Sequence, residues 1–230
     1  GIFSNITHDH LDFHKTFDSY LKAKKAFFDG LPKSAFALTN GDDKNGMVML
    51  QNTKASKKTY ALKQMGDFKA KLIENKFSGL HLDIDDTEVF FKMVGSFNAY
   101  NLLATYGTAM LLGQEKLNVL TILSTLAGAE GRFDYTVAKS GVIGIVDYAH
   151  TPDAVAQAVQ ALLPLAKSRG GELTCVLGCG GDRDAAKRPL MAAAAEQYAQ
   201  HVVLTSDNPR SEDPQTILNH MLTGLHNAAN

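Results

Sequence analysis

The spacing of apolar and polar positions changes at about residue 130. Beyond it, short apolar runs rich in β-branched residues alternate with segments of helical spacing. The runs lie at 142–146, 173–177 and 201–205, and the helical segments at 152–167, near 189–200 and from 214 onward. This alternation is typical of right-handed crossovers in a parallel sheet. We therefore expect a Rossmann-like α/β fold here, with residues 142–146 as a fully buried strand.

The first part of the chain has a mixed pattern. Residues 1–6 resemble the end of a buried strand, and Thr16 or Asp18 can cap a helix that runs through Phe28. A further strand is expected at 35–39, followed by a turn at 40–43 in which an aspartate can cap a helix through residue 49. These elements predict an α/β arrangement here as well.

Alternating apolar positions then predict three strands joined by charged turns, at 68–73, 79–84 and 87–93. They are expected to form a small antiparallel insertion or a sheet edge. Two helices follow, one opening at Gly95 with Ser96 as its cap and one at about 118–127. Residues 128–131 are the best candidate for a linker, which divides the chain into domains of 1–129 and 130–230.

Composition narrows the class of protein. The chain has 230 residues, of which 45% are hydrophobic, and a formal net charge of −1. That charge, without a long basic run, argues against a nucleic-acid-binding surface, and no apolar run approaches the length of a membrane span. The two cysteines show no disulfide spacing, so we expect a cytoplasmic protein. We also expect a fragment of a longer protein, because no start methionine precedes the strand at residue 2.

Two features near the start of the chain could carry chemistry. His8, His10, Asp12 and His14 have spacing that could serve a zinc site, a single histidine beside magnesium and phosphate, or an ordinary loop. Lys24 falls on the apolar stripe of the helix that ends at Phe28. A buried unpaired ammonium is costly, so Lys24 either extends its amine to solvent or is chemically special.

Asn98 and Asn101 lie one helical turn apart, where two amides could bind the edge of a base, although helix capping explains Asn98 as well. Asp147 and His150 follow the strand at 142–146. They are therefore expected at the carboxyl ends of the strands, where α/β domains bind ligands.

Two polar loops follow neighbouring predicted strands, one with Arg183 and the other with Asp207, Asn208 and Arg210. Guanidinium groups pair with carboxylates and an aspartate pairs with an amine, so together they suit a ligand that carries both groups. A surface cluster of ion pairs is the alternative. The Gly178-Cys179-Gly180-Gly181 stretch does not match GxGxxG, so a dinucleotide is not indicated.

Seven stretches together resemble the Mur ligase family. They cover most of the chain in the family's order: NITHDHLDFH, YLKAKKAFF, GSFNAYN, GRFD, VDYAHTPDA, GCGGDRD with KRP, and DNPR. The resemblance implies that residues 1–129 are the C-terminal part of a central P-loop-type ATPase domain. Residues 130–230 would then be an incomplete Rossmann-like C-terminal domain. DNPR resembles the form found in ligases that add meso-diaminopimelate.

The resemblance also implies residue roles. Lys24 corresponds to the family's carbamoylated lysine, and His10 to the histidine ligand of the same Mg²⁺ ion. Asn98, Asn101, Arg132, Asp147 and His150 correspond to residues that contact ATP. The positions that match the diaminopimelate site are Arg183, Asp207, Asn208, Pro209 and Arg210.

The implied reaction is ATP-dependent amide formation through an acyl phosphate, with UDP-MurNAc-L-Ala-D-Glu and diaminopimelate as substrates, by a monomer. The family's P-loop, its N-terminal uridine-binding domain and its terminal GKGHE-like segment are absent from the sequence, so the fragment alone is expected to be inactive. Alternatives are the same reaction with L-lysine, a folylpolyglutamate- or cyanophycin-type ligase, and a non-catalytic nucleotide-binding relative. A zinc hydrolase would be distinguished by stoichiometric zinc.

Overall fold

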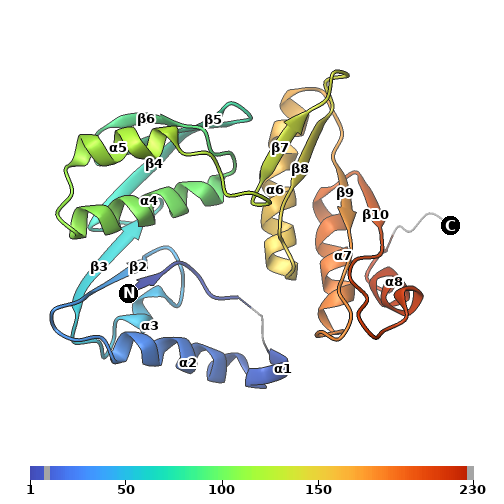
Figure 1. Ribbon diagram of the computed structural model, residues 1–230, viewed down its shortest axis with the longest axis horizontal. Coiled ribbons are helices and arrows are strands. Elements are labelled where there is room, and N and C mark those ends of the chain that lie inside the picture. Colours follow the sequence, from blue (N-terminus) through green and yellow to red (C-terminus); the bar gives the residue numbers. More distant parts are fainter. Residues whose placement is uncertain (8–10, 227–230) are drawn as a thin grey trace. The chain divides into compact units, whose positions relative to one another are not determined.

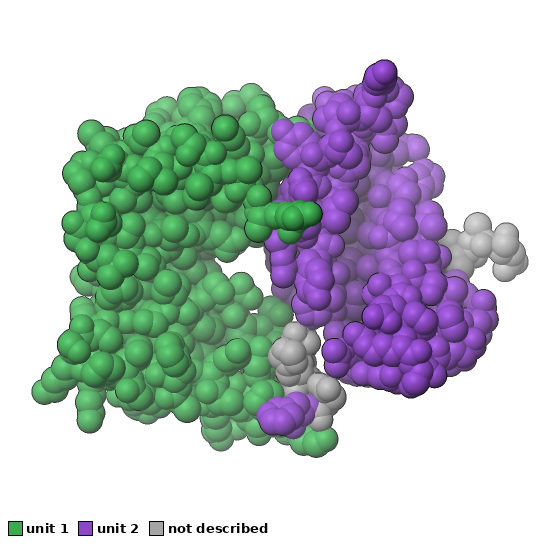
Figure 2. All heavy atoms as spheres, in the orientation of Figure 1, with its two compact units in different colours: residues 1–7, 14–130 green, residues 8–13, 131–230 purple. Residues whose placement is uncertain are grey.

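The structure, a computed structural model, describes residues 1–7 and 11–226. Contacts divide the chain into two compact units, shown in different colours in Figure 2. Unit 1 comprises Gly1–Thr7 and His14–Glu130, and unit 2 comprises His8–Phe13 and the chain from Gly131 onward. Among the described helices, none is long and apolar enough to cross a membrane.

Unit 1 is built on one six-stranded sheet whose strands follow chain order (Figure 1). The strands are β1 (Ile2–Phe3), β2 (Phe36–Asn40), β3 (Ser56–Ala61), β4 (Phe68–Lys76), β5 (Gly79–Ile84) and β6 (Glu88–Phe91). The pairs from β1 to β4 are parallel, and β4, β5 and β6 pair antiparallel. The antiparallel strands expected from the alternating pattern are thus confirmed, and they form one edge of the sheet.

Helices cover both faces of this sheet. They are α2 (Phe17–Asp29), α3 (Gly46–Met49), α4 (Ser96–Leu111) and α5 (Lys116–Thr125), and a short α1 (Leu11–His14) precedes them. Successive side chains of a strand point to opposite faces. Accordingly, Leu38 joins the core beneath α4 and α5, while Ala37 joins the core beneath α2 and α3.

The helix starts differ in part from those expected. Thr16 caps α2, because its Oγ accepts a hydrogen bond from the Ser19 backbone N–H at 3.1 Å. Ser96 is not the cap of α4: Gly95 occupies that position with a φ of 94°, a conformation that favours glycine. The expected aspartate cap of α3 was wrong too, because its N-cap is Asn45, whose side chain makes no capping bond.

Unit 2 alternates strands and helices as predicted. Its elements are β7 (Asp134–Val137), β8 (Ile143–Val146), α6 (Pro152–Ser168), β9 (Thr174–Leu177), α7 (Lys187–Tyr198), β10 (His201–Leu204) and α8 (Pro214–Leu222). Strands β9 and β10 are parallel. The core joins Val155 and Val159 of α6 to Met191 and Ala195 of α7 and Ile217 of α8. This is the α/β fold expected from the sequence.

One expectation for unit 2 was wrong. Residues 142–146 are not a fully buried strand, since Val142 and Val146 are 66% and 62% exposed. β8 pairs antiparallel with β7, and β9 and β10 form a separate sheet. The antiparallel pairing results from the short turn between β7 and β8. In this turn Gly141 adopts a φ of 86° and the Ala138 N–H donates to the Val142 carbonyl oxygen. This turn makes a hairpin whose outer face meets water.

Candidate functional site

A cavity of about 380 Å³ lies between the end of β1 and the helix α2 in unit 1. Its lining combines aromatic rings with polar groups: Ile2, Phe3, Ser4, Asn5, Tyr20, Ala23, Lys24, Phe27 and Phe28. The Lys24 ammonium lies 5.5 Å from the centre of the Tyr20 ring, which is within reach of a cation–π interaction. Lys24 therefore borders a space large enough for a small anionic group.

Lys24 is exposed, so its expected place on the inward face of α2 was wrong. The lysine that turns inward is Lys25, whose side chain is only 13% exposed and pairs with Asp29 at 2.5 Å. Phe27 is also largely exposed, whereas Phe28 is buried. Lys24 thus has the solvated amine that was one of the two sequence-based interpretations.

A metal site formed by protein carboxylates, thiolates and imidazoles is not present among residues 1–7 and 11–226, where no three such residues cluster. The histidine ligand expected at His10 lies outside the described residues. His14 is described and stacks on the Tyr20 ring with 5.0 Å between ring centres. Of the four residues of the histidine-rich stretch, only His14 has a side chain that can be placed.

Asn98 and Asn101 lie together at the start of α4, as their spacing predicted. The Asn98 Nδ2 donates to the Val94 carbonyl oxygen at 2.7 Å, and the Asn101 Nδ2 donates to the Asn98 Oδ1 at 3.0 Å. Asn98 therefore fixes the chain just before the helix, but it is not the cap, because Gly95 occupies the N-cap position and no side chain makes a capping bond there. Asn101 is exposed, and the oxygen of its side-chain amide can still accept a hydrogen bond from a ligand.

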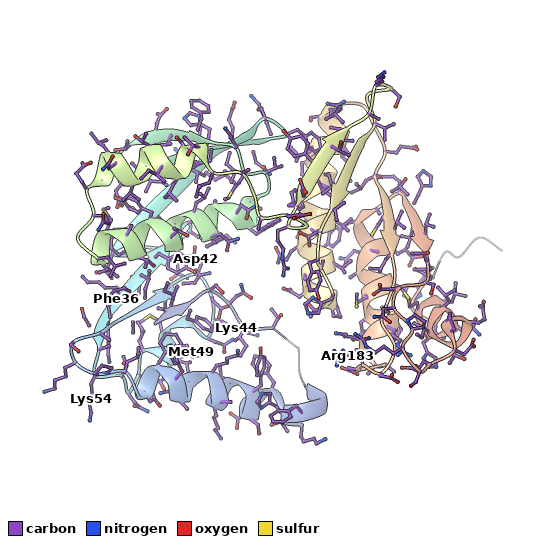
Figure 3. The ribbon with its side chains drawn as sticks, viewed as in Figure 1. Phe36, Asp42, Lys44, Met49, Lys54 and Arg183 are labelled. Atoms are coloured by element: carbon purple, nitrogen blue, oxygen red, sulfur yellow. The ribbon has the colours of Figure 1, made fainter. Side chains whose placement is uncertain are left out.

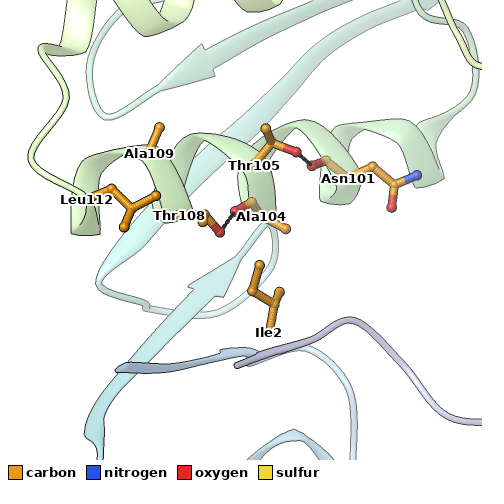
Figure 4. Close-up of a pocket in the computed structure, with 7 residues that line it drawn as sticks. All are labelled: Ile2, Asn101, Ala104, Thr105, Thr108, Ala109 and Leu112. Atoms are coloured by element: carbon orange, nitrogen blue, oxygen red, sulfur yellow. Dashed lines mark hydrogen bonds between the residues drawn. The ribbon is translucent and has the colours of Figure 1, made fainter. Parts of the chain in front are cut away.

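A groove of about 510 Å³ runs along the same helix, and Figure 4 shows the residues that line it. They are Ile2, Asn101, Ala104, Thr105, Thr108, Ala109 and Leu112. The hydroxyl groups of Thr105 and Thr108 donate to carbonyl oxygens of α4 itself, at 2.9 and 2.7 Å. The groove is therefore mainly apolar with an amide at one end, which suits a flat ring system.

Asp42 ties α4 to the loop after β3. Its carboxylate accepts backbone hydrogen bonds from Leu62, Lys63 and Gln64 at 2.7–3.0 Å, and a further bond from the Tyr100 hydroxyl at 3.0 Å. Burial alone would raise the pKa of Asp42, but these donors outweigh it and lower the pKa below the ordinary value. Asp42, labelled in Figure 3, thus acts as a charged link that positions the helix.

Arg132, Asp147 and His150 are close together in unit 2. The Asp147 carboxylate accepts from the Phe133 and Ala149 backbone N–H groups, each at 2.9 Å, and so holds the segment before β7 against the end of β8. The Arg132 guanidinium lies 4.6 Å from the centre of the Tyr148 ring. His150 packs edge-on to the same ring. Tyr148, which the sequence analysis did not single out, links the side chains of Arg132 and His150.

The two polar loops, here the β9–α7 loop (178–186) and the β10–α8 loop (205–213), are joined by hydrogen bonds. Gly181 N–H donates to the Asn208 carbonyl oxygen at 2.9 Å, and the Arg210 Nη1 donates to the Gly181 carbonyl oxygen at 2.6 Å. A Cβ on Gly181 would lie 1.8 Å from the Pro209 carbonyl oxygen, so only glycine fits. Arg183 is exposed on the first of these loops (Figure 3).

A charged pair that the sequence pattern did not predict lies next to these loops, with one partner buried and the other partly exposed. Arg188, at the start of α7, is 1% exposed and binds both carboxylate oxygens of Glu212, at 2.7 and 2.9 Å. This hydrogen bonding lowers the pKa of Glu212 to about 2. The sequence held a signal, because Arg188 has helical spacing with Met191, Ala192 and Ala195, all buried.

Two family models match the chain. "Mur ligase middle domain" matches residues 1–109, and "Mur ligase, glutamate ligase domain" matches residues 131–229. Among curated proteins, the chain is 55% identical over 225 residues to UDP-N-acetylmuramoyl-L-alanyl-D-glutamate–2,6-diaminopimelate ligase of Cytophaga hutchinsonii. That match covers 98% of this chain and 46% of the relative. The chain thus spans about half the length of the curated relatives it matches.

Solved structures that are similar to this chain are also ligases of this kind by name. A structure of UDP-N-acetylmuramoyl-L-alanyl-D-glutamate–2,6-diaminopimelate ligase is 34% identical, with a TM-score of 0.62, over 97% of this chain and 47% of that chain. MurF ligase from Thermotoga maritima in complex with ADP is 16% identical, with a TM-score of 0.68, over 97% and 61%. The second likeness supports the fold alone.

Proposed function

Because the chain belongs to the Mur ligase family, we propose that the protein is an ATP-dependent amide ligase that adds meso-diaminopimelate to UDP-N-acetylmuramoyl-L-alanyl-D-glutamate. The observation that carries this proposal is the joining of the β9–α7 and β10–α8 loops, which bear Arg183 and Arg210. The name shared by the similar curated proteins supports the same reaction.

The amino-acid substrate would bind at these joined loops. Arg183 and Arg210 would pair with its carboxylates, because planar guanidinium groups match the geometry of a carboxylate. Asp207 and Asn208 would meet an ammonium group, and Pro209 shapes the contact between the loops through its carbonyl oxygen. The Arg210 Nη1 is already bound to Gly181, so the side chain is partly oriented before a ligand arrives.

Each unit, taken by itself, holds residues that would contact ATP. In unit 1, the apolar groove beside Asn101 suits the adenine ring, and Asn98 holds the helix start in place. In unit 2, Arg132 would contact phosphate oxygens while Asp147 and His150 complete the contacts to the nucleotide. Cationic groups aimed at the transferring phosphoryl group stabilise the charge that it carries in the transition state.

The cavity beside Lys24 fits a role in magnesium binding on one condition. An ammonium cannot ligate a cation, whereas carbamoylation would turn Lys24 into a carboxylate, the kind of ligand that Mg²⁺ prefers. The exposure of Lys24 and the polar Ser4 and Asn5 in the same cavity support this assignment. The family resemblance alone suggests His10, which lies outside the described residues, as a further ligand. When bound, the ion would neutralise charge on the phosphates.

The reaction would proceed in two steps. The γ-phosphoryl group of ATP is transferred to the terminal carboxylate of the UDP-linked dipeptide, which releases ADP and forms an acyl phosphate. The neutral amine of diaminopimelate then attacks the acyl carbon, and a tetrahedral intermediate collapses to the amide and phosphate. Holding the amine near the acyl carbon would itself lower the barrier.

A separate observation supports a proposal for the compartment. Cys175 and Cys179 are both free thiols, and a reducing cytoplasm is where free thiols persist. We therefore propose a cytoplasmic enzyme. That it acts as a monomer stays a prediction.

The test is phosphate release by the natural full-length protein with ATP and UDP-N-acetylmuramoyl-L-alanyl-D-glutamate. Meso-diaminopimelate and L-lysine are offered in separate reactions, and a reaction without amino acid is the blank. Release that depends on diaminopimelate is the expected result. A preference for L-lysine would keep the ligase and contradict the assignment of Arg183 and Arg210, while no release with either would contradict the ligase.

A further inference from the structure

Arg188 lies beneath both loops of the proposed amino-acid site. Its Nη1 and Nη2 donate to the two carboxylate oxygens of Glu212, at 2.9 and 2.7 Å, in a two-point arrangement. The Arg188 side chain is almost entirely buried, whereas Glu212 keeps partial contact with water. Such bidentate pairs fix the orientation of both partners as well as their distance.

The same two residues reach three segments of unit 2. The Arg188 Nη2 also donates to the Gly180 carbonyl oxygen at 3.4 Å, and its Nη1 lies 3.0 Å from the His220 Nδ1 on α8. The Glu212 Oε1 accepts a second hydrogen bond, from the Asp182 backbone N–H at 2.6 Å. The pair therefore connects the β9–α7 loop, the β10–α8 loop and α8.

These connections control the backbone on which the proposed substrate contacts stand. Asp182, next to Arg183, has a φ of 51°, and Arg210 has a φ of 49°. Both values lie in the left-handed region, which non-glycine residues rarely adopt. Strained conformations of this kind persist only where the surroundings determine them. The hydrogen bond from Asp182 to Glu212 is one such determinant.

Stability alone is a poor explanation for this pair. Replacing a buried ion pair by apolar residues of similar volume is often neutral or stabilising, because the charges must be taken out of water. What apolar residues cannot do is hold backbone groups of two loops at fixed hydrogen-bonding distances. The pair is therefore better explained by the geometry that it imposes.

We propose that Arg188 and Glu212 are positioning residues that set the separation of Arg183 and Arg210, and with it the binding of an amino acid that carries two carboxylates. This inference rests on the proposed ligase function. Neither residue touches the substrate, and both act through the two loops.

The experiment uses steady-state phosphate release by the full-length enzyme, with meso-diaminopimelate and ATP varied separately. The variants are Glu212→Gln, which keeps the shape but removes the charge, and Arg188→Lys, which keeps the charge but removes the two-point geometry. We expect both to raise the KM for diaminopimelate about tenfold or more, since a small misplacement of a contact is costly. The KM for ATP should stay within about twofold.

A matched control comes from the other end of the same strands. Glu172→Gln removes a carboxylate that pairs with His201 at 3.0 Å, at the start of β10 and far along the strand from the loops. Its KM for diaminopimelate should equal that of the wild type. A further variant, Glu212→Asp, keeps the negative charge on a shorter side chain. Its KM for diaminopimelate should lie between those of the wild type and Glu212→Gln.

Three results would overturn the inference. One is an unchanged KM for diaminopimelate in both variants, and another is an equal rise in the KM of every substrate. The third is loss of folded protein in both variants by circular dichroism, which would assign the pair a general structural role. A wild-type enzyme without amino-acid-dependent phosphate release would instead refute the proposed function itself, so the two failures are distinguishable.

Discussion

The two units hold their candidate ligand-contacting residues by different means. In unit 1, Asn98 and Asn101 lie on α4, which is fixed to the sheet by burial of Ala99, Leu102 and Leu103. In unit 2, the candidate residues for the amino-acid substrate lie in loops that are joined by hydrogen bonds, a charged pair and one glycine contact. The scaffold of unit 1 is a broad apolar core, and the scaffold of unit 2 is a small set of polar contacts between two loops.

This difference predicts how each scaffold fails. Apolar burial has no direction and scales with area, so a lost methyl group in unit 1 weakens the whole packed layer. Hydrogen bonds depend steeply on distance and angle, so a displaced loop in unit 2 loses its geometry at once while the core persists. Changes in unit 1 should therefore lower stability broadly, and changes in unit 2 should alter a site.

The largest effect is expected for Leu103→Ala. Leu103 is fully buried between α4 and the sheet, so truncation removes apolar contacts and leaves a cavity. The cost should be about 2–5 kcal/mol of unfolding free energy. Native-state hydrogen exchange in α4 and β4 measures it within unit 1 alone.

The control for this variant is Leu117→Ala on α5, where the side chain is 61% exposed. Its effect should stay within about 0.5 kcal/mol. Equal exchange rates in the two variants would show that apolar burial does not fix α4. That result would contradict the description of unit 1 as an apolar scaffold.

The next effect is expected for Gly181→Ala. The added Cβ would meet the Pro209 carbonyl oxygen at 1.8 Å, so the two loops must separate. We expect a cost of about 1–3 kcal/mol, with faster exchange of the loop amides and little change in α6. Gly144→Ala is the matched control, because its Cβ would make only ordinary contact with Thr136 at 3.5 Å. A uniform loss of protection across unit 2 would contradict a local polar scaffold.

A smaller effect is expected for Tyr100→Phe, which tests the polar link in the apolar unit. The change removes the hydrogen bond to Asp42 and keeps the ring, so the cost should be about 1 kcal/mol. Tyr135→Phe, at an exposed position of β7, is the control and should be neutral. A cost as large as that of Leu103→Ala would mean that the polar link, and not apolar burial, fixes α4.

The same variant has a pH signature. The folded pKa of Asp42 lies below its ordinary value, so its contribution to stability is present above a pH of about 4 and is lost as the pH falls through the folded pKa. Removing the Tyr100 donor raises the folded pKa of Asp42. The acid-dependent loss of stability from Asp42 should therefore be smaller in Tyr100→Phe than in the wild type and should be complete at a higher pH.

Local patterns were enough to predict most of the elements. The alternating strands of unit 1 and the order of strands and helices in unit 2 follow from spacing alone, and both are present. Strand pairing was harder. An apolar run such as 142–146 looks alike in a parallel core and in a hairpin, because spacing contains no information about the partner. The turn at Gly141, four residues after Val137 at the end of β7, was the signal that favours a hairpin.

The direction of side chains explains which site residues the sequence pattern did not predict. Lys24 and Lys25 are adjacent, and a shift of one position around the helix decides which one turns inward. Arg188 was left out because the predicted helix began near Pro189, one residue too late to include it. Tyr148 lay within a recognised motif, but nothing in its spacing indicates the stacked Arg132. These features depend on contacts between residues, which a pattern along the chain cannot contain.

The smallest effect is expected for Tyr148→Leu in unit 2. Its ring lies under the Arg132 guanidinium at 4.6 Å and is itself largely exposed, where a cation–π interaction contributes about 0.5–1 kcal/mol. If Arg132 contacts the nucleotide, the KM of the full-length enzyme for ATP should rise about two- to fivefold, while the KM for diaminopimelate stays constant. Tyr148→Trp keeps a ring and should resemble the wild type. A rise in the KM for diaminopimelate instead would mean that the nucleotide contacts and the amino-acid contacts of unit 2 depend on the same scaffold. The two sets of contacts in unit 2 could then not be treated as separate local sites.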